Sequence, residues 1–169
     1  DSRVTVELGE SYVDQGATAY DLLEGDLTDR ITVSGEVDTN VKGTYEITYS
    51  VENSSGAVVS AVRTVIVQDV TAPILKLLGA PALTVEGGIR YVDAGASAID
   101  GCDGDITTEI FVYGYVDTKR VGKYILAYEV SDYSGNAAAP VYRTVDVVDT
   151  TPPIITLNGP STVYIEQYD

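Results

Sequence analysis

Residues 122–130 read GKYILAYEV, and residues 43–51 read GTYEITYSV. In both stretches every second position from the tyrosine onward is Tyr, Ile, Leu or Val. Because side chains alternate between the two faces of a β-strand, this pattern predicts a strand with one face toward a core. The same core-facing strand is therefore expected twice, 79 residues apart.

The repetition extends along the chain. Asp14-Gln15-Gly16-Ala17, for example, returns as Asp93-Ala94-Gly95-Ala96. A period of about 80 residues is too long for a solenoid repeat and suits a small independent domain. We therefore predict domain 1 at residues 1–69 and domain 2 at residues 70–149.

The last stretch, residues 150–169, begins a third copy. Pro153-Ile154-Ile155-Thr156-Leu157 repeats Pro73-Ile74-Leu75-Lys76-Leu77, the first strand expected in domain 2, whereas domain 1 starts later and lacks it. The tail is therefore either the start of a repeat cut from a longer array, or a donor strand that inserts Ile154 and Leu157 into a neighbouring molecule. The array is favoured because Thr162-Val163-Tyr164-Ile165-Glu166 continues into a strand that domain 1 already has at Val4-Thr5-Val6-Glu7.

The composition argues against several classes of function. The chain carries 26 acidic and 10 basic residues, a formal net charge of −16, and such a field repels nucleic acid and anionic lipid. No run of about 20 apolar residues occurs, so direct membrane insertion is not expected. Histidine, the usual general base and zinc ligand, is absent, and the single cysteine permits no intrachain disulfide. The opening residues show no signal-peptide pattern, as expected for a mature or excised segment.

Short strand patterns separated by turn residues fill each repeat. Asn53-Ser54-Ser55-Gly56 and Asp132-Tyr133-Ser134-Gly135-Asn136 have the composition of hairpin turns, and no stretch shows a sustained helical period. Six or seven short strands at this spacing are typical of a β-sandwich. The predicted fold class is therefore all-β. The strands expected in domain 2 are residues 74–78, 83–86, 90–99, 106–115, 124–131 and 141–148.

Within this class the chain resembles the immunoglobulin (Ig) fold. Tyr45 and Tyr124 each follow a glycine by two positions and stand where an Ig domain keeps its tyrosine corner, while Ile47 and Leu126 replace the cysteine expected two residues later. The wider motif string resembles the bacterial Ig-like domain named from pesticidal crystal proteins, a relative of the hyalin repeat. That string is Tyr91-Val92-Asp93-Ala94-Gly95-Ala96, Asp103-Gly104-Asp105, Val116-Asp117-Thr118, Ser131-Asp132-Tyr133-Ser134-Gly135-Asn136, Arg143-Thr144-Val145 and Asp149-Thr150-Thr151-Pro152-Pro153.

The resemblance covers almost the whole chain and implies tandem immunoglobulin-like β-sandwiches, which occur as arrays in secreted and surface proteins. It implies a non-enzymatic spacer, filament or adhesion segment of an extracellular or cell-surface protein. The expected partners are neighbouring Ig-like repeats, in cis or as head-to-tail copies joined by strand addition, with a surface glycan or protein receptor as a further hypothesis. The alternative is a carbohydrate-binding module of a secreted enzyme or toxin. Its platform would be Tyr113, Tyr115, Tyr133 and Tyr142, although such tyrosines are more often strand surface.

Acidic loops offer a candidate metal site. Strand directions place the loop Asp100–Asp105 at the linker end of domain 2, together with the turn that begins at Asp132. Carboxylates clustered on a glycine-containing loop suit Ca²⁺, which would stiffen the domain junction. The alternative is that these acids form Asx turns and face water. The predicted ligands are Asp69, Asp100, Asp103, Asp105 and Asp132, with Asp21, Glu24 and Asp26 as the equivalent acids of domain 1.

Two arginines and the cysteine complete the candidates. Arg63 and Arg143 share the strand parity of core-facing valines, so each is expected at the rim of its sandwich, either paired with a loop carboxylate such as Asp14 or Asp93 or exposed to water. Cys102 lies in an acidic loop, where charge repulsion is expected to raise the pKa of its thiol and weaken it as a nucleophile. With no histidine as base, catalysis is not expected.

Overall fold

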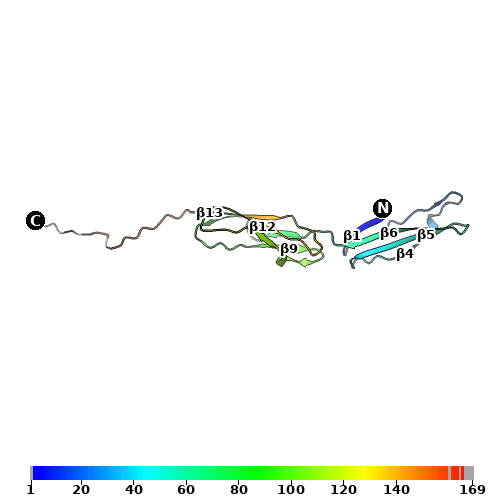
Figure 1. Cartoon of the computed structure of the whole chain (residues 1–169), viewed down its shortest axis with the longest axis horizontal. Helices are drawn as coiled ribbons and strands as arrows, with labels where there is room; N and C mark the ends of the chain where they lie inside the picture. The colour runs from blue at the N-terminus through cyan, green and yellow to red at the C-terminus, as the bar shows by residue number, and fades with distance from the viewer. Residues whose placement is uncertain (1, 160, 164, 166–169) are drawn as a thin grey trace.

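The computed structural model describes residues 2–159, 161–163 and 165. Its regular structure consists of β-strands and two short 3-10 turns, so the all-β prediction is confirmed. Strand pairings fall into two separate sets, within residues 3–68 and within residues 74–148. Figure 1 shows the two sets end to end, and we keep the names domain 1 and domain 2 for them. Among the described residues, no helix is long and apolar enough to cross a membrane.

Domain 1 is built on one four-stranded sheet with the order β1-β6-β5-β4. β1 runs parallel to β6, whereas β5 pairs antiparallel with both β6 and β4. The opposite layer contains only the short β2–β3 pair and the loop before it. The elements are β1 (Arg3–Glu7), β2 (Tyr20–Asp21), β3 (Gly25–Asp26), the 3-10 turn η1 (Thr28–Arg30), β4 (Thr32–Ser34), β5 (Gly43–Glu52) and β6 (Val58–Gln68).

Domain 2 repeats this sheet as β11-β12-β13-β8 and adds a three-stranded layer, β10-β9-β7. The two layers enclose a core that includes Ala98, Ile106 and Tyr128, none of them more than 1% exposed. The elements are β7 (Ile74–Leu77), β8 (Ala82–Glu86), β9 (Ala96–Asp100), β10 (Gly104–Asp105), η2 (Thr107–Glu109), β11 (Phe111–Tyr113), β12 (Gly122–Glu129) and β13 (Val141–Val148).

Among the described residues of domain 1, no strand takes the place that β7 has in domain 2. In domain 2, β7 pairs antiparallel with β9 and buries Leu75, while Ile74 is 62% exposed. By the repeat, Leu75 corresponds to Ile155 of the tail. By this correspondence, a donor strand would direct Ile155 and Leu157 inward rather than the expected Ile154 and Leu157, because residues two apart share one strand face.

Two predicted strands are shorter than expected. Residues 90–95 are not strand, because Gly95 adopts φ +76° and its N–H bonds the Asp93 carboxylate (3.1 Å), which turns the chain before β9. The predicted strand 106–115 begins instead with η2, since Asp105 Oδ1 accepts the N–H of Thr107 (3.0 Å). Side chains that bond their own backbone compete with the sheet at both places.

The tyrosine corner is present in both domains. The Tyr45 hydroxyl donates to the carbonyl of Val41 and the Tyr124 hydroxyl to that of Arg120, each at 2.9 Å. Both rings are half-buried. The fully core-facing tyrosines are instead the ones four residues later in each strand, described below.

Candidate functional site at the domain junction

The linker is held by side chains of both domains. Glu7, the last residue of β1, accepts the backbone N–H of Val70 (2.9 Å) and the thiol of Cys102 (3.4 Å). Because Cys102 lies in the β9–β10 loop, the end of domain 1 contacts the loop predicted at the linker end of domain 2. The sequence analysis missed Glu7, although Glu86 repeats it at the end of β8 and was an available signal.

The opposite side of the junction is also bridged. Asn136 Nδ2 donates to the backbone carbonyl of Asp69 (3.3 Å), and Lys42 Nζ of domain 1 donates to Ser134 Oγ of domain 2 (2.7 Å). The turn 132–136 therefore reaches the linker, as its position in the sequence predicted.

Three carboxylates meet beside these bridges. Asp69, Asp103 and Asp132 each offer an oxygen, and the three atoms lie within 4.8 Å of one another. They come from the linker, the β9–β10 loop and the turn after β12. Asp69 and Asp132 are only 4% and 6% exposed. The fold thus brings together three of the five predicted ligands.

Backbone donors orient all three acids, and Asp69 Oδ1 accepts the N–H of Thr71 (3.2 Å). Asp132 Oδ1 accepts the N–H groups of Ser134 (2.9 Å) and Asn136 (2.8 Å), and Asp103 Oδ2 accepts that of Tyr133 (2.8 Å). Burial raises the pKa of Asp132, but the hydrogen bonds from Asn136 and Ser134 outweigh it, so the pKa lies below its usual value. Asp132 is therefore held as a carboxylate.

The remaining two predicted ligands behave differently from each other. Asp100 is 5% exposed and its Oδ1 holds the loop by accepting the N–H groups of Cys102 (2.7 Å) and Asp103 (2.9 Å). Asp105 is exposed, holds η2 through Thr107, and does not join the group of three. The Asx-turn geometry of the alternative stated above is present not only at Asp105: an aspartate accepts the N–H of the residue two positions later also at Asp69, Asp100 and Asp132.

Cys102 is a poor nucleophile in this setting. Burial raises the pKa of its thiol to about 11, and the hydrogen bond to Glu7 and the nearby charges of Asp69 and Asp100 act in the same direction. Desolvation by burial contributes most to the raised pKa of the Cys102 thiol, more than the charge repulsion expected from the sequence.

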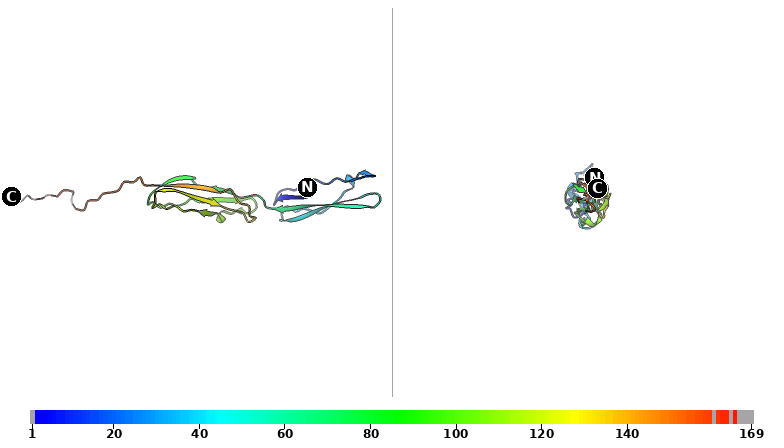
Figure 2. Two further views of the ribbon diagram at one scale, coloured as in Figure 1. Left: turned by 45° about the horizontal axis from the view of Figure 1, so that its top comes forward. Right: turned by 90° about the vertical axis from the view of Figure 1, so that its left-hand side faces the viewer.

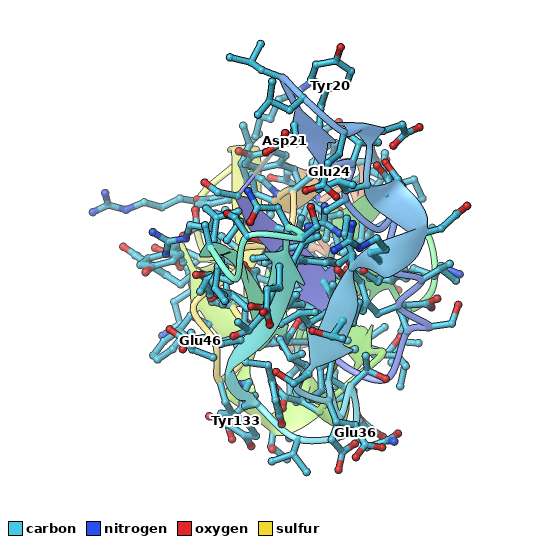
Figure 3. The ribbon with its side chains drawn as sticks, turned by 90° about the vertical axis from the view of Figure 1, so that its right-hand side faces the viewer. Tyr20, Asp21, Glu24, Glu36, Glu46 and Tyr133 are labelled. Carbon is cyan, nitrogen blue, oxygen red and sulfur yellow. The ribbon has the colours of Figure 1, made fainter. Side chains whose placement is uncertain are left out.

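The equivalent loop of domain 1 lies at the far end of the molecule. Figure 3 looks onto that end, where Asp21 and Glu24 lie close together. Here a side-chain cation is present: Arg30 Nη1 bonds Glu24 Oε2 at 2.7 Å. Asp21 bonds Asn53 (3.2 Å), and Asp26 bonds the N–H of Thr28 (2.9 Å). Among the described residues, no group of three acids includes Asp21, Glu24 or Asp26.

A second polar cluster lies inside each sandwich. In domain 2 the guanidinium of Arg143 bonds the Asp93 carboxylate, whose oxygens also accept the hydroxyls of Tyr91 (2.8 Å) and Tyr128 (2.7 Å). Domain 1 repeats this with Arg63, Asp14, Tyr12 and Tyr49. The predicted arginine–aspartate pairing is confirmed, but Arg143 is 1% exposed rather than at the rim. Its charge is compensated inside the domain, which is typical of a structural ion pair.

Two surface grooves complete the candidates. One, of about 430 Å³, opens onto the core of domain 1 and is lined by apolar residues that include Ala17, Leu27 and Val51. The other, of about 580 Å³, lies on domain 2 and is lined by Phe111, Tyr113 and Tyr133 among others. Tyr115 and Tyr142 do not line it, so the predicted platform of four tyrosines is divided.

These features define an Ig-like β-sandwich protein with an acidic junction between its domains. The family described as "Bacterial surface protein, Ig-like domain" matches residues 1–67 and 75–147, so the chain belongs to this family. The resemblance to the pesticidal-crystal-protein type is confirmed by pesticidal crystal protein Cry22Aa of Bacillus thuringiensis. That protein is 33% identical over 161 residues, which cover 84% of this chain and 22% of the relative.

Other relatives share parts of the chain. An uncharacterized 81.3 kDa protein of Acholeplasma phage L2 is 31% identical over 132 residues, which cover 74% of this chain and 18% of that protein. The chain thus spans about a fifth of the length of these curated relatives. Among solved structures, the M60 catalytic domain with CBM51-1 and CBM51-2 from Clostridium perfringens ZmpB matches with a TM-score of 0.50 and 13% identity. The match covers 87% of this chain and 30% of that one, and it shows a shared fold.

Proposed function

We propose that this chain is a non-enzymatic spacer segment of a bacterial surface or extracellular protein. The observation that carries the proposal is the fixed linker: Asp69 is buried, and the next residue, Val70, bonds Glu7 of domain 1. Domains joined by a free linker move relative to one another by default. A linker held at both domains would instead add the second domain to the length of the first. Figure 2 shows the result, a body that is long from the side and narrow from the end.

The same linker motif recurs at the end of domain 2. Glu86 accepts the N–H groups of Thr150 (2.8 Å) and Thr151 (3.0 Å), as Glu7 accepts that of Val70. The hydrogen bond from the Thr150 hydroxyl (2.7 Å), together with these backbone hydrogen bonds, lowers the pKa of Glu86 to about 2. The motif supports the addition of a further repeat beyond residue 150 in the same manner.

The test is the distribution of distances between the two domains, measured by energy transfer between dyes on exposed positions. We expect a narrow distance distribution in the unaltered chain. A broad distribution is expected after Glu7→Ala, or after insertion of the four residues Gly-Ser-Gly-Ser directly after Asp69. Glu86→Ala is the matched control, because it removes the same motif beyond domain 2. A distribution that is equally broad in the unaltered chain and the insertion variant would reject the spacer function.

Neighbouring repeats are the proposed partners. The apolar groove of domain 1 lies where β7 packs in domain 2, and we infer that it takes a strand of the same Pro-Ile-Leu type. A chain extended at its N-terminus by a copy of residues 71–79 carries such a strand in register, since β1 and β8 are related by the 79-residue repeat. We expect this extension to raise the melting temperature of domain 1. The same extension with Leu75 and Leu77 replaced by Asp is the control, and an equal rise with both extensions would reject the groove as a strand site.

Carbohydrate binding is the second candidate function, favoured by the aromatic groove of domain 2. Phe111 and Tyr113 are 66% and 56% exposed, and Tyr133 is 72% exposed. Aromatic faces of this kind stack on sugar rings. A glycan array with the unaltered chain and with Tyr113→Ala tests this candidate, and binding that survives Tyr113→Ala together with Phe111→Ala would exclude this groove.

A further inference from the structure

We propose that the domain junction binds a divalent calcium ion through Asp69, Asp103 and Asp132. The three ligand atoms already lie within 4.8 Å of one another in a geometry built by three separate segments. Backbone N–H groups hold one oxygen of each of Asp69, Asp103 and Asp132, so the three ligands are preorganised. The inference concerns binding and does not depend on the spacer function.

The independent observation is a buried oxygen without a partner. Asp69 is 4% exposed, and its Oδ2 atom is buried with no hydrogen-bond partner; the same holds for Oδ2 of Asp100 in the adjoining loop. Buried polar atoms are almost always bonded, and a charged one without a partner is especially unfavourable. A cation among the carboxylates would supply the missing interaction of Asp69.

Basic side chains do not supply the positive charge that these carboxylates lack. None of the ion pairs formed between residues 2 and 159 includes Asp69, Asp103 or Asp132. Lys42, the basic side chain that crosses the junction, bonds the hydroxyl of Ser134 instead. Three carboxylates at this separation repel one another, and burial of two of them strengthens the repulsion.

The repeat itself provides a comparison. In domain 1 the corresponding loop places Arg30 against Glu24 at 2.7 Å. The position equivalent to Arg30 in domain 2 is Glu109, so the side-chain cation is replaced by a further acid. The junction therefore has the carboxylates of the loop without its arginine.

The donor set selects the metal. The three ligands are carboxylate oxygens, which suit hard cations, and Ca²⁺ accepts irregular oxygen coordination more readily than Mg²⁺. Cys102, the soft donor beside the site, donates its thiol hydrogen to Glu7. Zinc, which prefers thiolate and imidazole, is disfavoured because the chain has no histidine.

Binding would join the linker to domain 2. Asp69 belongs to the linker, whereas Asp103 and Asp132 belong to two loops of domain 2. One ion would therefore tie the linker to both loops, in addition to the hydrogen bond from Asn136 to Asp69.

The experiment uses the full chain, freed of metal with chelator and titrated with CaCl₂. We expect heat of binding by calorimetry and a rise of the melting temperature on the order of 5 °C at millimolar Ca²⁺. Tb³⁺ provides an optical probe, because excited Tyr133, whose N–H bonds Asp103, would sensitise its emission, and Ca²⁺ should quench that emission by displacement.

Matched variants localise the site. Asp103→Asn should abolish the calcium-dependent rise of the melting temperature. Without calcium, this variant should melt at or above the temperature of the unaltered chain, because the substitution relieves repulsion among the three carboxylates. Asp105→Asn, in the same loop but outside the group, should keep the full response. No binding heat at millimolar Ca²⁺ with identical melting in chelator would overturn the proposal, as would a calcium response retained in Asp103→Asn. Either result would leave the distance measurement of the spacer function unaffected.

Discussion

The guanidinium of Arg143 bonds the carboxylate of Asp93 in the interior of domain 2, with only 1% of the arginine side chain exposed. The arginine also bonds the hydroxyl of Tyr128 (3.2 Å) and the carbonyls of Ala80 (3.1 Å) and Gly95 (3.1 Å). It thereby fixes the chain before β8 and the turn before β9 onto β13. In domain 1 the equivalent Arg63 is 16% exposed.

Arg143→Met should therefore destabilise domain 2 strongly. Removing one partner of a fully buried ion pair typically costs about 3–5 kcal/mol. Because Asp93 is 27% exposed and keeps the hydrogen bonds from Tyr91 and Tyr128, we expect a loss near the lower end of that range. Chemical denaturation followed by tyrosine fluorescence gives the free energy of unfolding. Lys123→Met is the control, since its ion pair with Asp146 joins exposed side chains and should contribute less than about 1 kcal/mol. Equal losses in the two variants would contradict the structural role of Arg143.

The same aspartates predict a dependence of stability on pH. Burial raises the pKa of Asp93, but hydrogen bonds from Tyr128 and Tyr91 and the ion pair with Arg143 outweigh it, so the pKa lies below its usual value. The pKa of Asp14 is lowered in the same manner, by hydrogen bonds from Tyr49, Tyr12 and Arg63 that outweigh burial. A carboxyl with a lower pKa in the folded state stabilises the fold above its unfolded pKa of about 3.9 and loses that contribution as the pH falls through the folded pKa.

We expect the melting temperature to be steady between about pH 7 and pH 5 in chelator and to fall below about pH 4. Asp93→Asn should melt lower at neutral pH and show a shallower fall in acid. Melting curves at each pH measure both effects. An acid fall as steep in Asp93→Asn as in the unaltered chain would show that other groups cause it.

Substitution of the tyrosine-corner residue Tyr124 is expected to cost less stability than its central place in the fold suggests. The Tyr124 ring is half-buried, so the loss expected for Tyr124→Phe is that of one hydrogen bond to the Arg120 carbonyl, about 1 kcal/mol. Tyr128→Phe should cost more, since Tyr128 is fully buried and its hydroxyl donates to the part-buried carboxylate of Asp93. Exposed Tyr142 is the control, and its change to Phe should be neutral. Denaturation midpoints give the order of the three losses in stability. A loss for Tyr124→Phe as large as that for Tyr128→Phe would contradict the smaller role assigned to the tyrosine corner.

The fold was predictable because its signals are local and repeated. The alternation around Tyr45 and Tyr124 indicated the central strands, and the bonds of their hydroxyls to the backbone were expected from the resemblance to the Ig tyrosine corner. The short strand β9 was mispredicted because the turn at Asp93 and Gly95 is stabilised by a side chain, which periodicity does not reveal. The junction was predicted only in part. Strand directions brought Asp103 and Asp132 to the linker, but the hydrogen bond from Cys102 to Glu7 depends on how the two domains pack, which one repeat does not encode.

The tail gives the last prediction, which concerns assembly. Ile154, Ile155 and Leu157 are 91%, 88% and 67% exposed, and this segment repeats the β7 sequence whose counterpart is missing from domain 1. If the tail of one copy enters the domain 1 groove of the next, the contact is head-to-tail and does not close on itself, so mass should grow with concentration. Light scattering should then show growth for the full chain and none for a chain ending at residue 149.

Single substitutions distinguish strand addition from non-specific hydrophobic association of the tail. Ile155→Asp and Leu157→Asp should each abolish the growth, because these positions correspond to Leu75 and Leu77 of β7. Ile154→Asp is the matched control: it adds the same charge at the position equivalent to Ile74, which stays exposed in domain 2, and growth should persist. A chain extended by residues 71–79 should remain monomeric, because its groove is filled in cis. An unchanged mass with and without the tail at high concentration would reject head-to-tail addition and favour the array, in which the strand for domain 1 comes from its own chain.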